Sequence, residues 1–140
     1  MTLDVGPTDD LPTCLALRRE VFIEEQGVAQ ALEQDGRYGE AHHILARLGG
    51  VPVGCARILI KGNTGKIGRV CVLKSRRGQG IGLALVEACL VHLRGAEGIT
   101  RAELGAQTQA MGLYARLGFT AYGEEFLDAD MPHRMMERAL

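Results

Sequence analysis

The stretch Arg76-Arg77-Gly78-Gln79-Gly80-Ile81-Gly82 decides the fold, because it joins an apolar, strand-like run to an apolar, helical run. Glycines let the backbone come close to a ligand, and the first N–H groups of a helix have no partner inside the helix. The helix dipole and two arginines add positive charge at the same place. The turn therefore predicts a site for a phosphate or pyrophosphate group.

The spacing of the glycines excludes the two common nucleotide loops. The pattern G-x-x-x-x-G-K-[ST] of the P-loop occurs nowhere in the chain. The dinucleotide pattern G-x-G-x-x-G fails because Leu83 stands at the third glycine position after Gly78 and Gly80. The pattern that fits is [QR]-x-x-G-x-[GA], which begins at Arg77 and ends at Gly82.

This pattern resembles the acyl-CoA pyrophosphate loop of the GCN5-related N-acetyltransferases, the GNAT superfamily. Downstream, residues 106–119 are similar to the superfamily signature N-x-x-A-x-x-x-Y-x-x-x-G-F, with Gln107 where asparagine is commoner. Residues 18–28 and 125–136 are similar to the first helix and the tail of the YjcF/ElaA-type branch. Four motifs in the family's order cover nearly all of the chain, which is thereby identified as a member.

The composition is that of one folded domain. Hydrophobic residues make up 46% of the chain and the mean hydropathy is +0.03, which argues against disorder. Residues 1–140 are expected to form a single domain around one core. No apolar run has the length of a membrane span and no leader opens the chain, which predicts a cytoplasmic protein. A net charge of −1 gives no sign of nucleic-acid or membrane partners.

The four cysteines predict neither a metal site nor a disulfide framework. None of them forms a C-x-x-C pair, and each has apolar neighbours in the sequence: Cys14, Cys55, Cys71 and Cys89. We expect reduced thiols in the core and no metal.

The expected order of elements is a helix, a three-stranded meander, and then alternating helices and strands. A helix capped by Thr8 or Asp9 is expected to run to about residue 26, and Gly27 closes it. Residues 29–41 are hard to assign, with a second short helix as one reading. Strands are expected over residues 43–48, 53–60, 66–73, 100–105, 119–123 and 133–139, with helices over 80–94 and 108–117.

These elements predict an α+β domain with a mixed sheet. The resemblance implies the GNAT fold: a mixed, mostly antiparallel central sheet with helices on both faces, splayed between strands 4 and 5. In such a sheet the free strand edge presents N–H and C=O groups to an amide-rich ligand such as the pantetheine arm of CoA.

The resemblance also implies acetyl-CoA as co-substrate, held mostly by backbone groups. The expected cofactor-binding residues are Val70, Cys71 and Val72 on the strand edge, Arg77, Gly78, Gln79, Gly80, Ile81 and Gly82 in the loop, and Gln107 downstream. Each set has a plainer alternative. The strand side chains also fit core packing, Arg77 fits a solvated loop, and Gln107 is a poorer helix cap than asparagine.

Tyr114 is the candidate catalytic residue. The resemblance implies that its phenol acts as the general acid for the departing CoA thiolate. Packing beside Leu113 and Leu117 is the alternative.

The general base that deprotonates the attacking amine is unassigned. Many relatives carry a glutamate on the fourth strand near the position of Gly68, which has no side chain. The remaining candidates are Glu25, Asp35, His42, His43, Glu103 and His133. Among these, His133 stands out because it lies in the tail motif Pro-His-x-x-Met.

The favoured function is an acetyl-CoA-dependent N-acetyltransferase that moves an acetyl group directly to a primary amine of a small molecule or peptide. An acyl-CoA-binding sensor module without catalysis is the alternative. Tyr114 favours the enzyme, whereas the missing carboxylate at Gly68 favours the sensor. Acidic residues near the first helix and the tail fit either a cationic acceptor or a solvated rim: Glu24, Glu25, Glu33, Asp35, Asp128 and Asp130. Relatives are commonly dimers, so a homodimer is compatible with the resemblance.

Overall fold

The computed structural model describes residues 1–30 and 36–140. Its strands are β1 (Leu3–Thr8), β2 (His42–Leu48), β3 (Val51–Lys61), β4 (Thr64–Val72), β5 (Arg101–Gln107), β6 (Thr120–Asp128) and β7 (Met131–Ala139). Its α-helices are α1 (Leu11–Arg18), α3 (Ile81–Arg94) and α4 (Met111–Ala115). The segment η1 (Arg19–Glu25) is a π-helix, and the short segments η2 (Tyr38–Glu40), η3 (Lys74–Arg76) and η4 (Thr108–Ala110) are 3-10 helices. Part of the short helix expected in residues 29–41, together with Glu33 and Asp35, lies outside the described residues.

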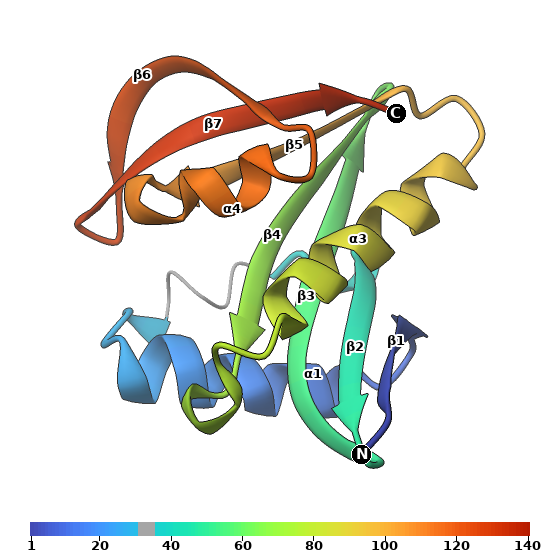
Figure 1. The fold of residues 1–140 in the computed structure, drawn as a ribbon, viewed down its shortest axis with the longest axis vertical. Coiled ribbons are helices and arrows are strands. Elements are labelled where there is room, and N and C mark those ends of the chain that lie inside the picture. Colours follow the sequence, from blue (N-terminus) through green and yellow to red (C-terminus); the bar gives the residue numbers. More distant parts are fainter. Residues whose placement is uncertain (31–35) are drawn as a thin grey trace.

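All seven strands belong to one sheet in the order β1-β2-β3-β4-β5-β7-β6. The β4–β5 pair is parallel and the other five pairs are antiparallel. Figure 1 shows β4 and β5 meeting at one end and diverging toward the other. The predicted α+β class and the mixed, mostly antiparallel sheet splayed between strands 4 and 5 are therefore confirmed.

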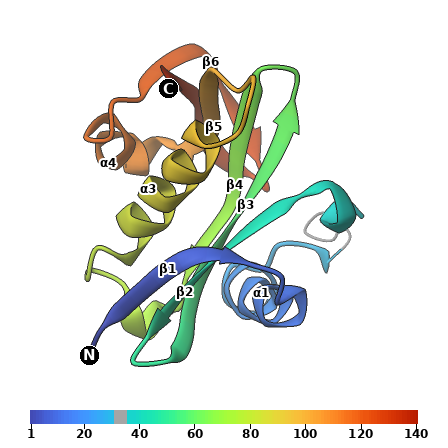
Figure 2. The same ribbon diagram turned by 90° about the vertical axis from the view of Figure 1, so that its right-hand side faces the viewer.

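Helices cover the two faces of the sheet unequally. Figure 2 shows α3 and α4 on one side of the sheet and α1 on the other. We call these sides the α3 face and the α1 face. The main core lies on the α3 face, where Leu85, Cys89 and Leu93 of α3 are completely buried against strand residues such as Ile44 and Ile58. Burying each such aliphatic side chain contributes about 1.5–3 kcal/mol, so α3 is the main anchor of the sheet.

A smaller core lies on the α1 face. It consists of Cys14, Leu17, Val21, Leu45, Cys55 and Cys71. All four cysteines are free and buried, as expected. On the other face, burial raises the pKa of the Cys89 thiol to about 12, which keeps that thiol protonated and unreactive.

The residue that caps the first helix lies one or two positions later than the sequence predicts. Asp10, rather than Thr8 or Asp9, is the N-cap: its carboxylate accepts from the Thr13 N–H at 3.2 Å and from the Thr13 hydroxyl at 2.7 Å. The Thr8 hydroxyl instead accepts from the Asp10 N–H at 3.1 Å. The helix continues from α1 into the π-helical η1 and ends before Gly27, whose φ is +71°.

Two strands differ from expectation because a turn-forming residue does not always end a strand. The short apolar run from Leu3 to Val5 precedes Gly6-Pro7 in the sequence, yet the strand continues to Thr8 as a full edge strand, β1, which tolerates Pro7 because an edge strand need not use every N–H group. Gly123 was expected to end β6, yet β6 runs on to Asp128 and the pairing with β7 shifts between Tyr122 and Phe126. Gly123, with φ of +73°, therefore lies in a bulge rather than at the strand end.

None of the helices in the described part of the chain combines the length and apolarity that a membrane span requires.

Candidate functional site

Strand β4 has a partner on its β5 side along only half its length. Residues Thr64, Gly65, Lys66 and Ile67 pair in parallel with β5, and the pairing ends at Ile67 and Leu104. From residue 68 to residue 72 the same side of β4 has no strand partner among the described residues. We call residues 68–72 the open edge. Its backbone N–H and C=O groups need partners from water or a ligand.

A β-bulge marks the point where β4 leaves β5. On β3, Ala56 alone lies between the paired residues Cys55 and Arg57, whereas Arg69 and Val70 both lie between their partners on β4. Arg69 has φ of +50°, a left-handed conformation that is uncommon for a residue with a side chain. A bulge bends its strand and increases the local twist, which accounts for the divergence of β4 from β5.

The side chains of the open edge pack in the core, while its backbone has no strand partner on the β5 side and the Val72 carbonyl accepts from Arg77 Nε. Cys71 is only 4% exposed and packs in the smaller core on the α1 face. Val70 and Val72 pack against the main core on the α3 face. Both predictions for these three residues, core packing and a backbone binding edge, are therefore compatible.

The glycine loop places α3 with an uncapped N-terminus directly after the open edge. Gly80 is the N-cap with φ of +79°, and no side chain caps the helix. The first N–H of the helix to find a helical partner is that of Ala84, which donates to the Gly80 carbonyl at 3.1 Å. The preceding N–H groups of Ile81, Gly82 and Leu83 have no partner within the helix and can bind an anion.

The glycine requirement at Gly78 and Gly80 is conformational. Both have φ of +79°, and a Cβ at either position would meet nothing within 4 Å. The loop is thus shaped by backbone angles that side chains disfavour and is open to a ligand. Gln79 lies between the two glycines and is exposed.

The Arg77 guanidinium is bound within the protein rather than free beside the helix. Its Nη1 and Nη2 each lie 2.6 Å from one oxygen of Glu25, and its Nε donates to the Val72 carbonyl at 3.1 Å. The Arg77 hydrogen bonds hold the pKa of Glu25 below its ordinary value. Arg77 therefore connects the loop to the end of η1, and the backbone N–H groups at the start of α3 are the main donors of the candidate anion site.

Tyr114 lies between α4 and α3. Its ring packs edge-on against Phe119 with the centroids 6.4 Å apart, and burial, followed by the nearby Cys89 thiol, raises its pKa. Its hydroxyl makes no hydrogen bond to any described residue. The ring thus packs on Phe119, and its hydroxyl has no competing partner among the described residues.

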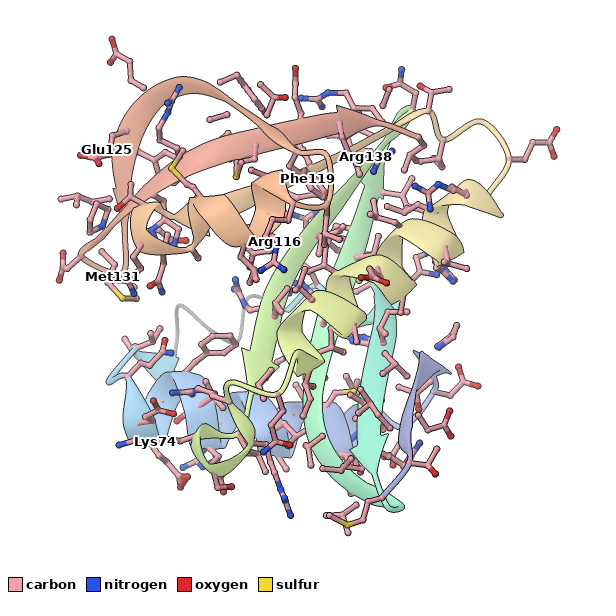
Figure 3. The ribbon with its side chains drawn as sticks, viewed as in Figure 1. Lys74, Arg116, Phe119, Glu125, Met131 and Arg138 are labelled. Atoms are coloured by element: carbon pink, nitrogen blue, oxygen red, sulfur yellow. The ribbon has the colours of Figure 1, made fainter. Side chains whose placement is uncertain are left out.

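Gln107 is the last residue of β5 and does not cap the following helix. Its Nε2 donates to the Met131 sulfur at 3.6 Å, and its Oε1 accepts from Gln109 at 2.9 Å. No side-chain bond caps η4. Figure 3 shows Met131 at the tip of the β6–β7 hairpin, and Lys74 on the other side of the divergence, after β4. Because Gln107 pairs with β7 and contacts Met131, it lies on the β5–β7 side.

Two base candidates are placed away from the divergence. Glu103 lies on the paired half of β5, where it accepts from the Tyr122 hydroxyl at 2.8 Å and from Arg101 at 3.0 Å. His42 lies beside His92 of α3, with the ring centroids 5.0 Å apart, which places it on the α3 face near the β1–β2 edge.

A buried arginine fixes the protonation of His43. Arg18 is completely buried, and its Nη2 lies 3.0 Å from His43 Nδ1. A guanidinium has no acceptor, so Nδ1 of His43 must carry the lone pair and the neutral ring carries its proton on Nε2. His43 thus presents a donor rather than a base. Arg18 Nε and Nη1 are sealed from solvent without a hydrogen-bond partner.

Arg116 is a residue that the sequence analysis did not single out. It is exposed at the end of α4, and Figure 3 shows its side chain extending toward α3. No ion pair or hydrogen bond engages it within the described residues. A basic residue two positions after Tyr114 was the available signal, but a lone exposed arginine is too common to interpret.

A surface hollow among the described residues lies away from the loop and the open edge. It has a volume of about 590 Å³ and is lined by residues from the converging end of β4 and β5, including Asn63, Thr100 and Arg138. Figure 3 likewise shows Arg138 near the end where the strands meet. The described residues contain no group of three potential metal ligands.

Comparisons with known proteins agree with this geometry. The acetyltransferase (GNAT) domain family matches residues 8–140. The N-acetyltransferase YjcF of Bacillus subtilis is 39% identical over 129 residues, which are 91% of each chain. An acyl-CoA N-acyltransferase from Pseudomonas aeruginosa is 34% identical with a TM-score of 0.86, covering 99% of this chain and 100% of that chain. Escherichia coli ElaA is 29% identical with a TM-score of 0.82, covering 98% of both chains.

A splayed sheet, a glycine loop at an uncapped helix start and relatives along the whole chain lead to one conclusion. The protein belongs to the GNAT family of N-acetyltransferases, in the branch of YjcF and ElaA.

Proposed function

We propose that this enzyme transfers an acetyl group from acetyl-CoA directly to a primary amine of a small molecule or peptide. The observation that carries the proposal is the continuity of the open edge with the uncapped start of α3. The edge offers backbone donors and acceptors to the amides of a pantetheine arm, and the helix start offers N–H groups to a pyrophosphate.

The backbone groups at the open edge and in the loop suit the amides and the pyrophosphate of acetyl-CoA. Val70, Cys71 and Val72 contribute backbone groups, while the loop from Gly78 to Gly82 contributes N–H groups without competing side chains. Two more distant family members support the choice of ligand. One from Elizabethkingia anophelis has acetyl-CoA bound, and one from Bacillus subtilis is in complex with CoA. When bound, acetyl-CoA supplies an activated thioester.

Tyr114 is proposed as the general acid. Its raised pKa keeps the phenol protonated at neutral pH, and its hydroxyl has no competing partner among the described residues. In the transfer, a C–N bond forms at the acceptor while the C–S bond of the thioester breaks. The Tyr114 hydroxyl donates its proton to the sulfur as the electron pair leaves with it.

Ligand binding is tested by thermal unfolding. Acetyl-CoA at 100 times its Kd should stabilise the protein by about 2.7 kcal/mol, with much smaller effects from NADH and ATP. A shift with NADH and none with acetyl-CoA would contradict the proposed ligand.

Turnover is tested separately by following free thiol release from acetyl-CoA in the presence of a panel of primary amines. Amine-dependent release is expected for the enzyme. Binding of acetyl-CoA without any amine-dependent release of thiol would favour the sensor alternative. The lack of a carboxylate at Gly68 is the feature of this chain that supports that alternative.

A further inference from the structure

We infer that Nε2 of His133 accepts the proton that the acceptor amine must lose. This inference rests on the proposed acetyl transfer and supplies the base for which Gly68 offers no side chain.

The main-chain carbonyl of Met131 fixes the tautomer of His133. Its Nδ1 lies 2.8 Å from the Met131 oxygen. A carbonyl oxygen only accepts, so Nδ1 must be the donor, and the lone pair of the neutral ring is on Nε2. This is the opposite of the arrangement at His43, where Arg18 occupies the lone pair.

The Nε2 atom of His133 is unengaged and reaches solvent. It makes no hydrogen bond among the described residues. His133 Nε2 is not among the side-chain nitrogens that are sealed from solvent without a hydrogen bond. The rest of the ring is held firmly, because His133 is only 8% exposed and stacks on Phe126 with the centroids 5.8 Å apart and the planes at 28°. A fixed ring with one open lone pair is the arrangement that a general base requires.

The register places His133 at the divergence. It pairs with Gln107, the last residue of β5, and both lie on the sheet face opposite Ala106, which is buried in the main core. His133 therefore lies on the α1 face, on the β5–β7 arm that faces the open edge of β4.

The residues directly beside His133 on its own and the paired strands are uncharged. Its cross-strand neighbours are Gln107 on β5 and Phe126 on β6, and its neighbours along the same face of β7 are Met131 and Met135. Gln109 of η4 bonds to Gln107 and is also uncharged. The charged groups on this face are Asp128 of β6, which pairs with Met131, and farther along Arg101, Glu103 and Glu137, which are engaged with one another.

The other candidate bases are engaged or displaced. The Glu25 carboxylate is bound at both oxygens by Arg77, and Glu103 is bound by Tyr122 and Arg101. His42 lies on the α3 face, and His43 presents a donor. Asp35 lies outside the described residues. Among the candidates that the structure describes, His133 alone combines a free lone pair with a position at the divergence.

Proton acceptance and proton donation then take place on opposite faces of the sheet. On the α1 face, the amine transfers its proton to His133 Nε2 as its nitrogen bonds to the acetyl carbon. On the α3 face, Tyr114 donates its proton to the departing sulfur. Exchange with water then returns the imidazolium and the tyrosinate to their starting states, so proton and charge balance over one turnover.

The test compares His133→Gln with wild type, using the most active amine of the panel in single-turnover conditions across pH. His42→Gln is the matched control, because it removes an imidazole of the same chain from the opposite face. We expect His133→Gln to reduce the single-turnover rate about 100-fold or more and to abolish the acid limb of the pH profile. The stabilisation by acetyl-CoA should be unchanged, and added imidazole should partly restore the rate of His133→Ala.

A wild-type measurement guards against variants that fail to fold. Nitrogen-15 NMR of the assigned His133 ring should show the proton on Nδ1, and a proton on Nε2 of the neutral ring would overturn the inference. An active wild type whose rate and pH profile survive His133→Gln would overturn it as well. A wild type without amine-dependent thiol release would contradict the proposed acetyl transfer itself, which is a separate outcome.

Discussion

The two halves of β4 belong to one strand but differ in what completes them. The half from Thr64 to Ile67 is completed by β5, and the half from Gly68 to Val72 has no strand on that side. Beside the paired half, side chains bind one another: Arg101 contacts Glu103 and Glu137, and Tyr122 donates to Glu103. Outside that network, Tyr114 of α4 and His133 of β7 keep a hydroxyl and a ring nitrogen without partners in the described chain. Where the protein satisfies its own polar groups it gains stability, and where it leaves them open it can bind and react.

Replacing Gly80 by valine should produce the largest functional loss. A β-branched residue at φ of +79° is strained by about 1–2 kcal/mol, so the loop is expected to leave the left-handed conformation and turn its N–H groups away. Acetyl-CoA binding by calorimetry should become undetectable while the protein still unfolds cooperatively. Gly82→Ala is the matched control, because its Cβ would meet only Val72 Cγ2 at 3.9 Å. Equal affinities in the two variants would place the phosphate site elsewhere.

Tyr114→Phe should slow acetyl transfer about 100-fold and leave acetyl-CoA affinity nearly unchanged. The substitution removes the hydroxyl and keeps the ring packed on Phe119. The measurement is a single-turnover rate, since slow product release would hide the effect in the steady state. A rate within about twofold of wild type would remove Tyr114 from the mechanism.

Gly65→Ala probes the paired half of β4. It should lower the free energy of unfolding and leave the affinity for acetyl-CoA unchanged. A Cβ at this position would lie 2.3 Å from Leu93 Cδ2, and Leu93 is completely buried. Overpacking of this kind costs about 1–3 kcal/mol. Denaturant unfolding should show that loss, while the Kd for acetyl-CoA at a temperature where the variant is folded stays close to wild type. A selective loss of affinity would mean that the two halves are not separable.

Tyr122→Phe sharpens the comparison between two tyrosines. Its hydroxyl bonds to Glu103 at 2.8 Å and to Arg101 at 3.2 Å, so its removal should destabilise the fold by about 1 kcal/mol. The single-turnover rate should remain that of wild type. A large rate loss in Tyr122→Phe would show that the paired half takes part in catalysis.

The smallest effect is expected for Glu25→Gln, and it depends on pH. Arg77 lowers the pKa of Glu25 in the folded protein, so the pair stabilises the fold above the ordinary carboxylate pKa. That stabilisation is lost as the pH falls through the lowered value. The Tm difference between wild type and Glu25→Gln should be present at pH 7 and should vanish well below about pH 4. A difference that persists in strong acid would require another cause.

The sequence predicted the features that short stretches determine. The glycine loop, the meander and the helix after Gly80 depend on neighbouring residues, and each is present where it was expected. The partnership of Arg77 with Glu25 was missed because 52 residues separate them and no local pattern links them. Gln107 precedes a helical turn, as expected, but its side chain contacts Met131 and Gln109 instead of capping that turn, because β5 and β7 pair at this point. The tautomer of His133 depends on a main-chain oxygen, which a sequence of side chains does not display.

The guanidinium of Arg77 is held by Glu25, and the helix that follows has no side-chain cap. We therefore expect the affinity of the loop for phosphate to depend mainly on its main-chain conformation and little on its side chains. Replacing the exposed Gln79 by alanine would therefore record little, although its N–H group belongs to the loop. Mutational drift can change that side chain freely, as long as the left-handed angles at Gly78 and Gly80 are inherited.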